Sequence, residues 1–135
     1  MKYYAIIDTN VLVSALLSRN ENAATAEIYR RIDFDEIIPV YSAAVMAEYE
    51  DVLHRAKFCF AEDAVRFILD EIVTRGKLVE ASEEGIILDD MGDVPFYAIV
   101  MDGAAEYLVT GNKKHFPVAD NIVTPREMLE IMDRG

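Results

Sequence analysis

Short runs of consecutive apolar, β-branched and aromatic residues alternate along the chain with segments in which apolar residues recur at helical spacing. Uninterrupted apolar runs of this length are typical of strands that are buried on both faces of a parallel sheet. The pattern predicts strands at Tyr3–Ile7, Glu36–Tyr41, Lys77–Glu80, Ile86–Leu88, Tyr107–Val109 and Ile122–Val123. Because proline cannot donate a hydrogen bond to a neighbouring strand, Pro39 predicts a sheet edge or a strand terminus.

The segments between these runs read as helices. Ser42 is a favourable N-cap, Gly76 a helix stop, and Thr124-Pro125-Arg126-Glu127 a capping box with proline at the first helical position. A polar turn at residues 18–21 separates the first two helices. The predicted helices cover residues 11–16, 22–31, 42–57, 62–75, a segment from Asp93 to Ala105, and the end of the chain from Thr124.

This alternation of strands and helices predicts an α/β fold, a three-layer α/β/α sandwich with a central, mainly parallel sheet. No repeat, low-complexity segment or linker interrupts it, so we expect a single domain over residues 1–135. In a parallel sheet the crevice for ligands lies beyond the carboxyl ends of the strands. Polar residues directly after a strand are therefore candidates for chemistry.

Composition narrows the class of protein. An apolar fraction of 53% argues against disorder, and the apolar runs are far shorter than the roughly 20 residues of a membrane span. The start of the chain looks like a strand rather than a signal peptide. The single cysteine, Cys59, lies among Phe58, Phe60 and Ala61, which favours a buried thiol in a reducing compartment. We therefore expect a cytoplasmic protein.

The formal net charge of −12 argues at first sight against nucleic-acid binding, which usually needs a basic face. Cations do cluster locally, but such clusters are more often solvated helix ends. The acid excess also indicates that divalent cations or a basic partner protein complete the electrostatics. The clusters are Arg30-Arg31, His54-Arg55-Ala56-Lys57, Arg75-Gly76-Lys77 and Lys113-Lys114-His115.

Three acids stand where one cleft could collect them. Asp8 follows the first strand, Asp93 opens a helix after the Ile86–Leu88 run, and Glu48 lies inside the helix that Ser42 begins. Glu50 and Asp51 lie about 200° and 300° further round that helix, so they cannot share its face with Glu48. Thr110-Gly111-Asn112 follows another strand and reaches the same edge of the sheet.

Converging carboxylates repel one another unless a cation lies between them. Mg²⁺ or Mn²⁺ takes oxygen ligands and leaves positions for substrate phosphate, which suits a few acids without a His or Cys cluster. Such a site hydrolyses phosphodiesters. Each residue also has a plainer interpretation: Asp93 as an N-cap, Asp8 as an Asx turn or cap, Glu48 as a solvated helix residue, and Asn112 as a turn residue.

An ordered set of motifs resembles the PIN-domain ribonuclease family, and in particular its small VapC-like members, which are toxin components of toxin-antitoxin systems. The resemblance runs from the first strand to the last helix. The motifs are IIDTNVLVSALL at residues 6–17, AEYEDVLHRAKF at 47–58, DVPFYAIV at 93–100 and EYLVTGNKKHFP at 106–117.

By this resemblance Asp8, Glu48 and Asp93 match the metal-binding acids of the family, and Asn10 the polar residue that supports the first of them. Thr110 matches a hydroxyl residue that positions a water or a phosphate oxygen. Asn112 stands where many members have a fourth acid; its carbonyl oxygen still assists catalysis, but it adds no charge, which weakens a second metal site. Candidates for a phosphate-contacting rim are Arg19, Arg55, Lys113 and Lys114.

The resemblance implies a Mg²⁺- or Mn²⁺-dependent endoribonuclease that acts on RNA, forms a homodimer and is held inactive by a cognate antitoxin protein. One alternative is a catalytically weak or inactive relative that binds RNA or a partner, which Asn112 favours. A receiver or haloacid-dehalogenase domain also has an acid after its first strand. The second of these needs another Asp two residues later, where this chain has Asn10, and no central Asp matches a receiver.

Overall fold

A computed structural model describes residues 2–17 and 23–135 of the chain. Its centre is a five-stranded sheet in which every pair of neighbouring strands is parallel, with the order β3-β2-β1-β4-β5. The most apolar predicted strand, β1, therefore lies in the middle of the sheet. The strands are β1 (Tyr3–Ile7), β2 (Ile37–Tyr41), β3 (Lys77–Leu78), β4 (Tyr107–Val109) and β5 (Ile122–Val123).

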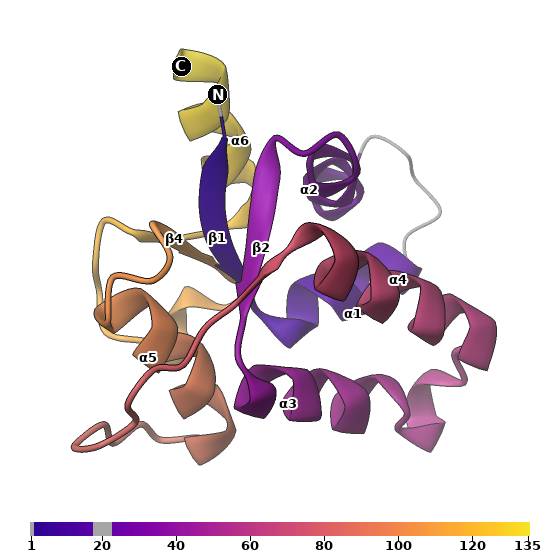
Figure 1. Cartoon of the computed structure of the whole chain (residues 1–135), viewed down its shortest axis with the longest axis horizontal. Coiled ribbons are helices and arrows are strands. Elements are labelled where there is room, and N and C mark those ends of the chain that lie inside the picture. The colour runs from indigo at the N-terminus through magenta and orange to yellow at the C-terminus, as the bar shows by residue number, and fades with distance from the viewer. Residues whose placement is uncertain (1, 18–22) are drawn as a thin grey trace.

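Helices cover both faces of the sheet, which gives the expected three-layer α/β/α sandwich. Helices α1, α2 and α4 lie on one side of β1 and β2, and α5 packs against β1 and β4 on the other (Figure 1). Helix α6 packs on α2. The described helices are α1 (Thr9–Leu17), α2 (Ala24–Asp33), α3 (Ala43–Leu53), α4 (Glu62–Arg75), α5 (Val94–Met101) and α6 (Pro125–Arg134), with short 3₁₀ turns η1 (Ala56–Phe58), η2 (Met91–Asp93) and η3 (Lys113–His115).

The predicted helix starts are made by the side chains that the sequence offers. Ser42 accepts a hydrogen bond from the Val45 backbone N–H, and Thr124 and Glu127 form the reciprocal capping box. Helix α4 covers the predicted range and buries its predicted apolar face, Val65, Ile68, Leu69 and Ile72. The predicted polar turn at 18–21 lies outside the described residues, and so does the predicted helix start at residue 22.

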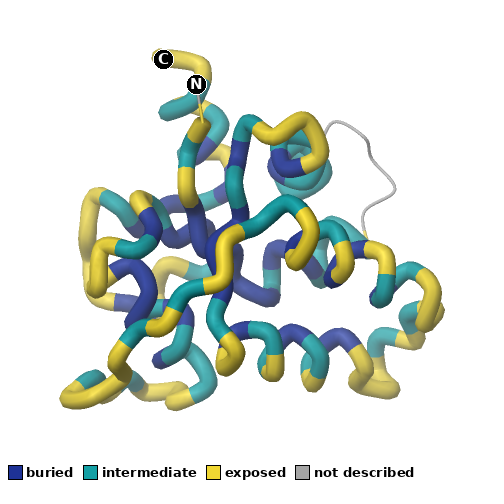
Figure 2. Tube along the Cα trace, in the orientation of Figure 1, coloured by how far each residue is buried: buried dark blue, intermediate teal, exposed yellow. Residues whose placement is uncertain are grey.

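Burial is concentrated along the strands and on the inward faces of the helices (Figure 2). The central strand buries Ala5, Ile6 and Ile7 completely, and Leu108 and Val109 of β4 are equally inaccessible. Burying an aliphatic side chain of this size stabilises the fold by about 1.5–3 kcal/mol. The strand ends are thus fixed in a rigid core, which in turn fixes the residues that directly follow them.

Two expectations about strands are wrong. Pro39 is not at an edge, because β2 lies between β1 and β3. Strand β3 begins at Lys77 opposite Val40, one residue beyond Pro39, so no strand residue lies opposite the missing N–H. The Ile86–Leu88 run forms no strand: Ile87 is 84% exposed, and Ile86 donates its N–H to the Glu83 carbonyl in a turn.

The expectation of a buried Cys59 is also wrong, because its side chain is exposed. Phe58 and Phe60 stack on each other with ring centroids 5.3 Å apart. Between them Cys59 adopts a left-handed backbone conformation with φ of 52°. Pairing of the two flanking rings leaves the thiol on the outside, where its Sγ contacts the Ala56 carbonyl.

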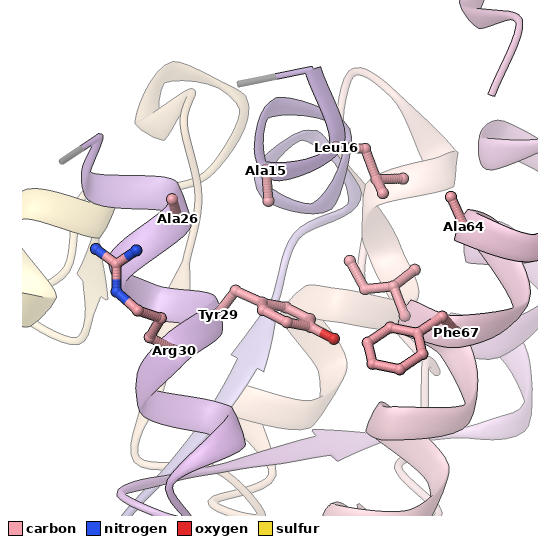
Figure 3. A pocket seen from close by; sticks show the side chains of 8 residues that line it. Ala15, Leu16, Ala26, Tyr29, Arg30, Ala64 and Phe67 are labelled. Atoms are coloured by element: carbon pink, nitrogen blue, oxygen red, sulfur yellow. The ribbon is translucent and has the colours of Figure 1, made fainter. Parts of the chain in front are cut away.

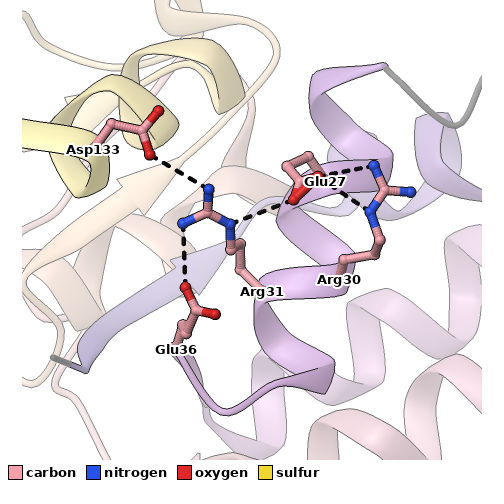
Figure 4. A network of polar contacts seen from close by, with 5 residues as sticks. All are labelled: Glu27, Arg30, Arg31, Glu36 and Asp133. Atoms are coloured by element: carbon pink, nitrogen blue, oxygen red, sulfur yellow. Dashed lines mark hydrogen bonds and ion pairs between the residues drawn. The ribbon is translucent and has the colours of Figure 1, made fainter.

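The amino ends of the strands are held by a network of ion pairs around Arg31 on α2 (Figure 4). The guanidinium contacts Glu27 on the same helix, Glu36 before β2 and Asp133 on α6, at distances between 3.2 and 3.4 Å. Glu27 also accepts from Arg30. The network ties α2, β2 and α6 together at the end of the sheet that lies opposite the candidate site.

Candidate active site

A cleft of about 240 Å³ lies at the carboxyl ends of the central strands, where a parallel sheet is expected to bind ligands. Residues that follow β1 or belong to α1, α3, η2, α5 and η3 come together there, although they are spread over more than a hundred positions of the chain. The cleft is lined by Asp8, Thr9, Asn10, Glu48, Val52, Arg55, Asp90, Gly92, Asp93, Phe96 and His115.

Asp8 lies at the floor of this cleft and is only 5% exposed. Its N–H donates to the Val109 carbonyl, so the residue continues the β1–β4 pairing by one position. Its Oδ2 accepts hydrogen bonds from Thr110 Oγ1 at 2.7 Å and from Asn10 Nδ2 at 3.2 Å. The acid that the core fixes in place is therefore also oriented by two side chains.

Asn10 and Thr110 link the ends of β1 and β4 around that carboxylate. Thr110 is completely buried, and its Oγ1 also accepts from the Asn112 N–H at 3.0 Å. Asn10 Oδ1 accepts from the Gly111 N–H at 3.0 Å. A Cβ at Gly111 would lie 3.3 Å from Asn10 Oδ1, so this close approach favours glycine.

Glu48 faces the same cleft from α3 because its neighbour Tyr49 anchors that helix. Tyr49 is 1% exposed, and its hydroxyl donates to the Ile7 carbonyl at the end of β1. Glu48 Oε1 lies 3.5 Å from the position that a Cβ on Gly92 would occupy. Glu50 and Asp51 instead make ion pairs with Arg66 and Arg55. This is the division of the three acids that helical geometry requires.

Asp93 enters the cleft from η2, directly before α5. Phe96 fixes the start of α5 by packing its ring against Tyr49, with the ring centroids 5.8 Å apart. Asp93 occupies the N-cap position of α5, as the plainer interpretation expects, but its side chain makes no capping hydrogen bond. Its Oδ2 is buried and accepts no hydrogen bond from any described residue, although His115 Nδ1 lies 3.3 Å away.

The carboxylates of the cleft disfavour one another's charge. Burial and the neighbouring Asp8 raise the pKa of Asp93 to about 6. Burial also raises the pKa of Glu48, to which Asp51, Asp90 and Asp8 add repulsion. Burial raises the pKa of Asp8 despite opposing hydrogen bonds from Thr110 and from the N–H groups of Thr9 and Asn10. Raised carboxyl pKa values that share one cleft mark a candidate functional site.

The predicted rim residues differ in position. Arg55 lines the cleft and pairs with Asp51 at 3.1 Å. Lys113 and Lys114 are exposed on η3, and Lys113 Nζ lies 3.0 Å from Glu127 Oε1 in the α6 capping box. Asn112 is absent from the described lining of the cleft, and its Nδ2 lies 3.0 Å from His115 Nε2. Arg19 lies outside the described residues.

Two lining residues, Asp90 and His115, were missed by sequence reasoning. Asp90 Oδ1 accepts from the Gly92 N–H at 2.9 Å and so begins η2. His115 is carried back into the cleft by the turn of η3. The sequence does contain a signal for each: an Asp two residues before a Gly, and a His three residues after a loop Asn. Neither spacing shows which side of the chain the residue faces.

The lining acids share the cleft without converging on one point. In the described part of the chain, no group of three His, Cys, Asp or Glu side chains is arranged to hold a metal ion. The donor set is nevertheless one that a hard cation prefers, since it consists of carboxylate and amide oxygens. The buried Asp93 Oδ2 in addition has no hydrogen-bond donor among the described residues.

A larger hollow of about 350 Å³ lies between α1, α2 and α4, away from these acids (Figure 3). Its walls are mainly apolar, with Leu16, Phe67 and Ile68 among the lining residues. The Tyr29 hydroxyl lies within it and has no hydrogen-bond partner among the described residues. The described lining residues of this hollow include no carboxylate or imidazole.

A family model of known proteins matches most of the chain. The family model described as PIN domain matches residues 4–114, which include every described lining residue of the cleft except His115. No curated protein matches the chain at a significant level. Within the described residues, no helix is both long enough and apolar enough to cross a lipid bilayer.

Proposed function

The chain belongs to the PIN-domain family, whose members are generally nucleases that use divalent metal ions, and we propose that it is a metal-dependent endoribonuclease. We propose further that it acts as one domain over residues 1–135 in the cytoplasm. The observation that carries the proposal is the meeting of Asp8, Glu48 and Asp93, from three separate elements, in one cleft at the carboxyl ends of the strands.

The side chains of the cleft suit Mg²⁺ or Mn²⁺. Three carboxylates with raised pKa values repel one another, and a divalent cation between them would remove that repulsion. Asp93 Oδ2, which has no described donor, would gain a partner. Because the acids do not converge in the present arrangement, binding of the ion requires them to draw together.

The division of roles follows from the contacts. Asp8, Glu48 and Asp93 would hold the ion, which when bound supplies the Lewis acidity for hydrolysis of a phosphodiester. Asn10 and Thr110 would orient Asp8 through their hydrogen bonds to its Oδ2. Thr110 is fully buried, so it acts on Asp8 rather than on a substrate phosphate.

We expect RNA to contact Arg55 and η3, since Arg55 and His115 of η3 both line the cleft. Arg55 is 49% exposed at its side chain and lines the cleft, so it is the first candidate for a phosphate contact. Lys114 is exposed on η3, whereas Lys113 would first have to leave Glu127. We therefore expect Arg55→Ala and Lys114→Ala to weaken RNA binding and reduce its salt dependence more than Lys113→Ala.

The cellular role we propose is that of the toxin in a toxin-antitoxin pair, active as a homodimer and inhibited by a cognate antitoxin. Induced expression of the wild type should arrest growth, and expression of Asp8→Asn should not. Equal growth under both conditions would contradict the toxin role without touching the nuclease activity. Sedimentation of the purified protein tests the homodimer separately.

The second candidate is a PIN domain that binds RNA or a partner without cutting RNA. It is favoured by the lack of a ready chelating group among the described acids and by Asn112 in place of a carboxylate. Under this alternative the protein would retain RNA on a filter but leave it intact at every Mg²⁺ and Mn²⁺ concentration.

Cleavage of a mixed panel of single-stranded RNAs tests the nuclease directly. Wild type, Asp8→Asn and the matched control Asp102→Asn, an exposed acid at the end of α5, are compared with Mg²⁺, with Mn²⁺ and with EDTA. We expect cleavage by the wild type and by Asp102→Asn only with metal, and none by Asp8→Asn. Cleavage that survives EDTA or Asp8→Asn would overturn the proposal.

A further inference from the structure

Asn112 contacts a histidine rather than the cleft. Its backbone N–H donates to Thr110 Oγ1, which fixes the residue at the end of β4. Its side-chain Nδ2 lies 3.0 Å from His115 Nε2. The turn of η3 places these two residues three positions apart and face to face. The Asn112 side chain thus contacts His115, whose ring lines the cleft.

The other nitrogen of that ring faces an acid. His115 Nδ1 lies 3.3 Å from Asp93 Oδ2, the buried carboxylate oxygen that accepts no hydrogen bond from any described residue. Asn112, His115 and Asp93 therefore form a row that runs from the loop after β4 to the start of α5.

The chemistry of the row determines where the proton of a neutral ring lies. An amide nitrogen can only donate, so Asn112 Nδ2 donates to His115 Nε2, which must then carry a lone pair. The single N–H of the neutral ring is in that case on Nδ1, the nitrogen that lies 3.3 Å from Asp93 Oδ2.

We propose that Asn112 is a positioning residue that holds His115 in the Nδ1–H tautomer, and that His115 in turn orients the Asp93 carboxylate in the cleft. The inference rests on the proposed function for its consequence, since it names how one acid of that site is held. Partners of this kind that orient a metal-binding or catalytic side chain are worth about 10- to 100-fold in affinity or activity.

The tautomer is measured on the metal-free protein by long-range ¹H–¹⁵N correlation of the histidine rings at about pH 8. The chain has two histidines, and His54→Gln leaves the signals of His115 alone. We expect the Nδ1–H pattern in this background and a majority of the Nε2–H pattern after Asn112→Ala. Val118→Ala, at an exposed position three residues beyond the ring, should leave the pattern unchanged.

Either of two results would overturn the inference: an Nε2–H ring when Asn112 is present, or an Nδ1–H ring that persists in Asn112→Ala. Because this measurement needs no RNA and no metal, it can fail while the nuclease proposal holds, and the reverse is equally true. Asn112→Asp gives a sharper test of the tautomer. A carboxylate can only accept a hydrogen bond, so this substitution should convert the neutral ring to the Nε2–H form.

Kinetics test the consequence for the site. His115→Gln keeps an N–H donor of similar reach, whereas His115→Phe keeps the ring shape without any donor. We expect His115→Phe and Asn112→Ala to lower kcat about 10- to 100-fold with little change in KM, and His115→Gln to recover part of the loss. Equal activity of His115→Phe and wild type would contradict a positioning role.

Discussion

The two ends of the sheet differ in how their acidic side chains are paired with cations. At the amino end, Glu27, Glu36 and Asp133 each lie within 3.4 Å of the Arg31 guanidinium (Figure 4). Hydrogen bonds from Arg30 and Arg31 lower the pKa of Glu27. There each carboxylate has a cationic partner, as is usual for surface acids.

At the carboxyl end the acids of the cleft have few cations to pair with. Among the described lining residues, the cationic side chains are Arg55, which pairs with Asp51, and His115, which is charged only when protonated. The pKa values of Asp8, Glu48 and Asp93 are all raised. The acids of the cleft thus repel one another, whereas the acids at the amino end are paired with cations. This difference indicates that the cleft is a binding site for a cation.

The largest effect should come from neutralising an acid of the cleft. Asp93→Asn is expected to lower RNA cleavage on the order of 100-fold or more, because even outer partners of a metal ligand are worth about 10- to 100-fold. Stability without metal should rise at the same time, since the substitution removes a repelled charge. Asp102→Asn on the same helix should change neither cleavage nor the urea midpoint. An Asp93→Asn protein less stable than wild type at pH 7 would contradict this difference between the two ends.

The pH dependence of stability gives the next largest effect. The pKa of Asp93 is about 6 in the folded protein against 3.8 for an unperturbed aspartate, so between these values the folded state binds more protons than the unfolded state. Stability from this group is thus fully present below pH 4 and is lost as pH rises through 6. The lowered pKa of Glu27 acts with the opposite sign, since its contribution is lost as pH falls below about 4.5.

Urea unfolding from pH 4 to 7 without divalent ions measures this difference. The advantage of Asp93→Asn over wild type should grow with pH and level off near pH 7 at about 2 kcal/mol, after allowance for water at the mouth of the cleft. Glu27→Gln should show a deficit that shrinks toward low pH. Parallel curves for wild type and Asp93→Asn would show that the carboxylate is not repelled.

Addition of metal tests the same difference between the two ends of the sheet, with a smaller expected effect on the free energy of unfolding. If the cleft binds Mg²⁺ or Mn²⁺, the ion at tenfold its Kd should raise the free energy of unfolding by about 1.4 kcal/mol. Asp8→Asn should lose this gain. Glu27→Gln should keep it, because Glu27 lies at the other end of the sheet. An equal gain in all three proteins would assign the ion to some other part of the surface.

Sequence patterns predicted the fold because the relevant interactions are local. A buried strand such as Tyr3–Ile7, the cap at Ser42 and the capping box at Thr124 are each determined within a few residues. The short and polar strands are harder, because pairing depends on neighbours that are distant in the chain. Lys77–Glu80 is accordingly reduced to Lys77–Leu78, and Ile86–Leu88 finds no strand beside it in the described structure.

The positions of the candidate site residues were predictable only where the sheet topology determines them. Parallel strands end at one edge, so Asp8 and the Thr110 loop had to meet there. The partner of Asn112 was not predictable, because the turn of η3 decides whether its amide meets the cleft or His115. Asp90 was missed and Cys59 was misjudged for a related reason: which way a loop residue faces depends on packing that the sequence pattern does not contain.

The smallest expected effect is on stability and comes from a substitution at the amino end of the sheet. This substitution distinguishes an effect on stability from an effect on RNA cleavage. Arg31→Gln removes the guanidinium that three acids share and should lower the free energy of unfolding by about 1 kcal/mol, the upper range for partly exposed pairs. Arg126→Gln, at an exposed position on α6, should cost less in the same urea titration. RNA cleavage by Arg31→Gln should match wild type, because the network and the cleft lie at opposite ends of the strands. A cleavage defect in Arg31→Gln beyond that of Arg126→Gln would mean that the two ends are coupled through the sheet, and that the repulsion in the cleft depends on the pairing at the other end.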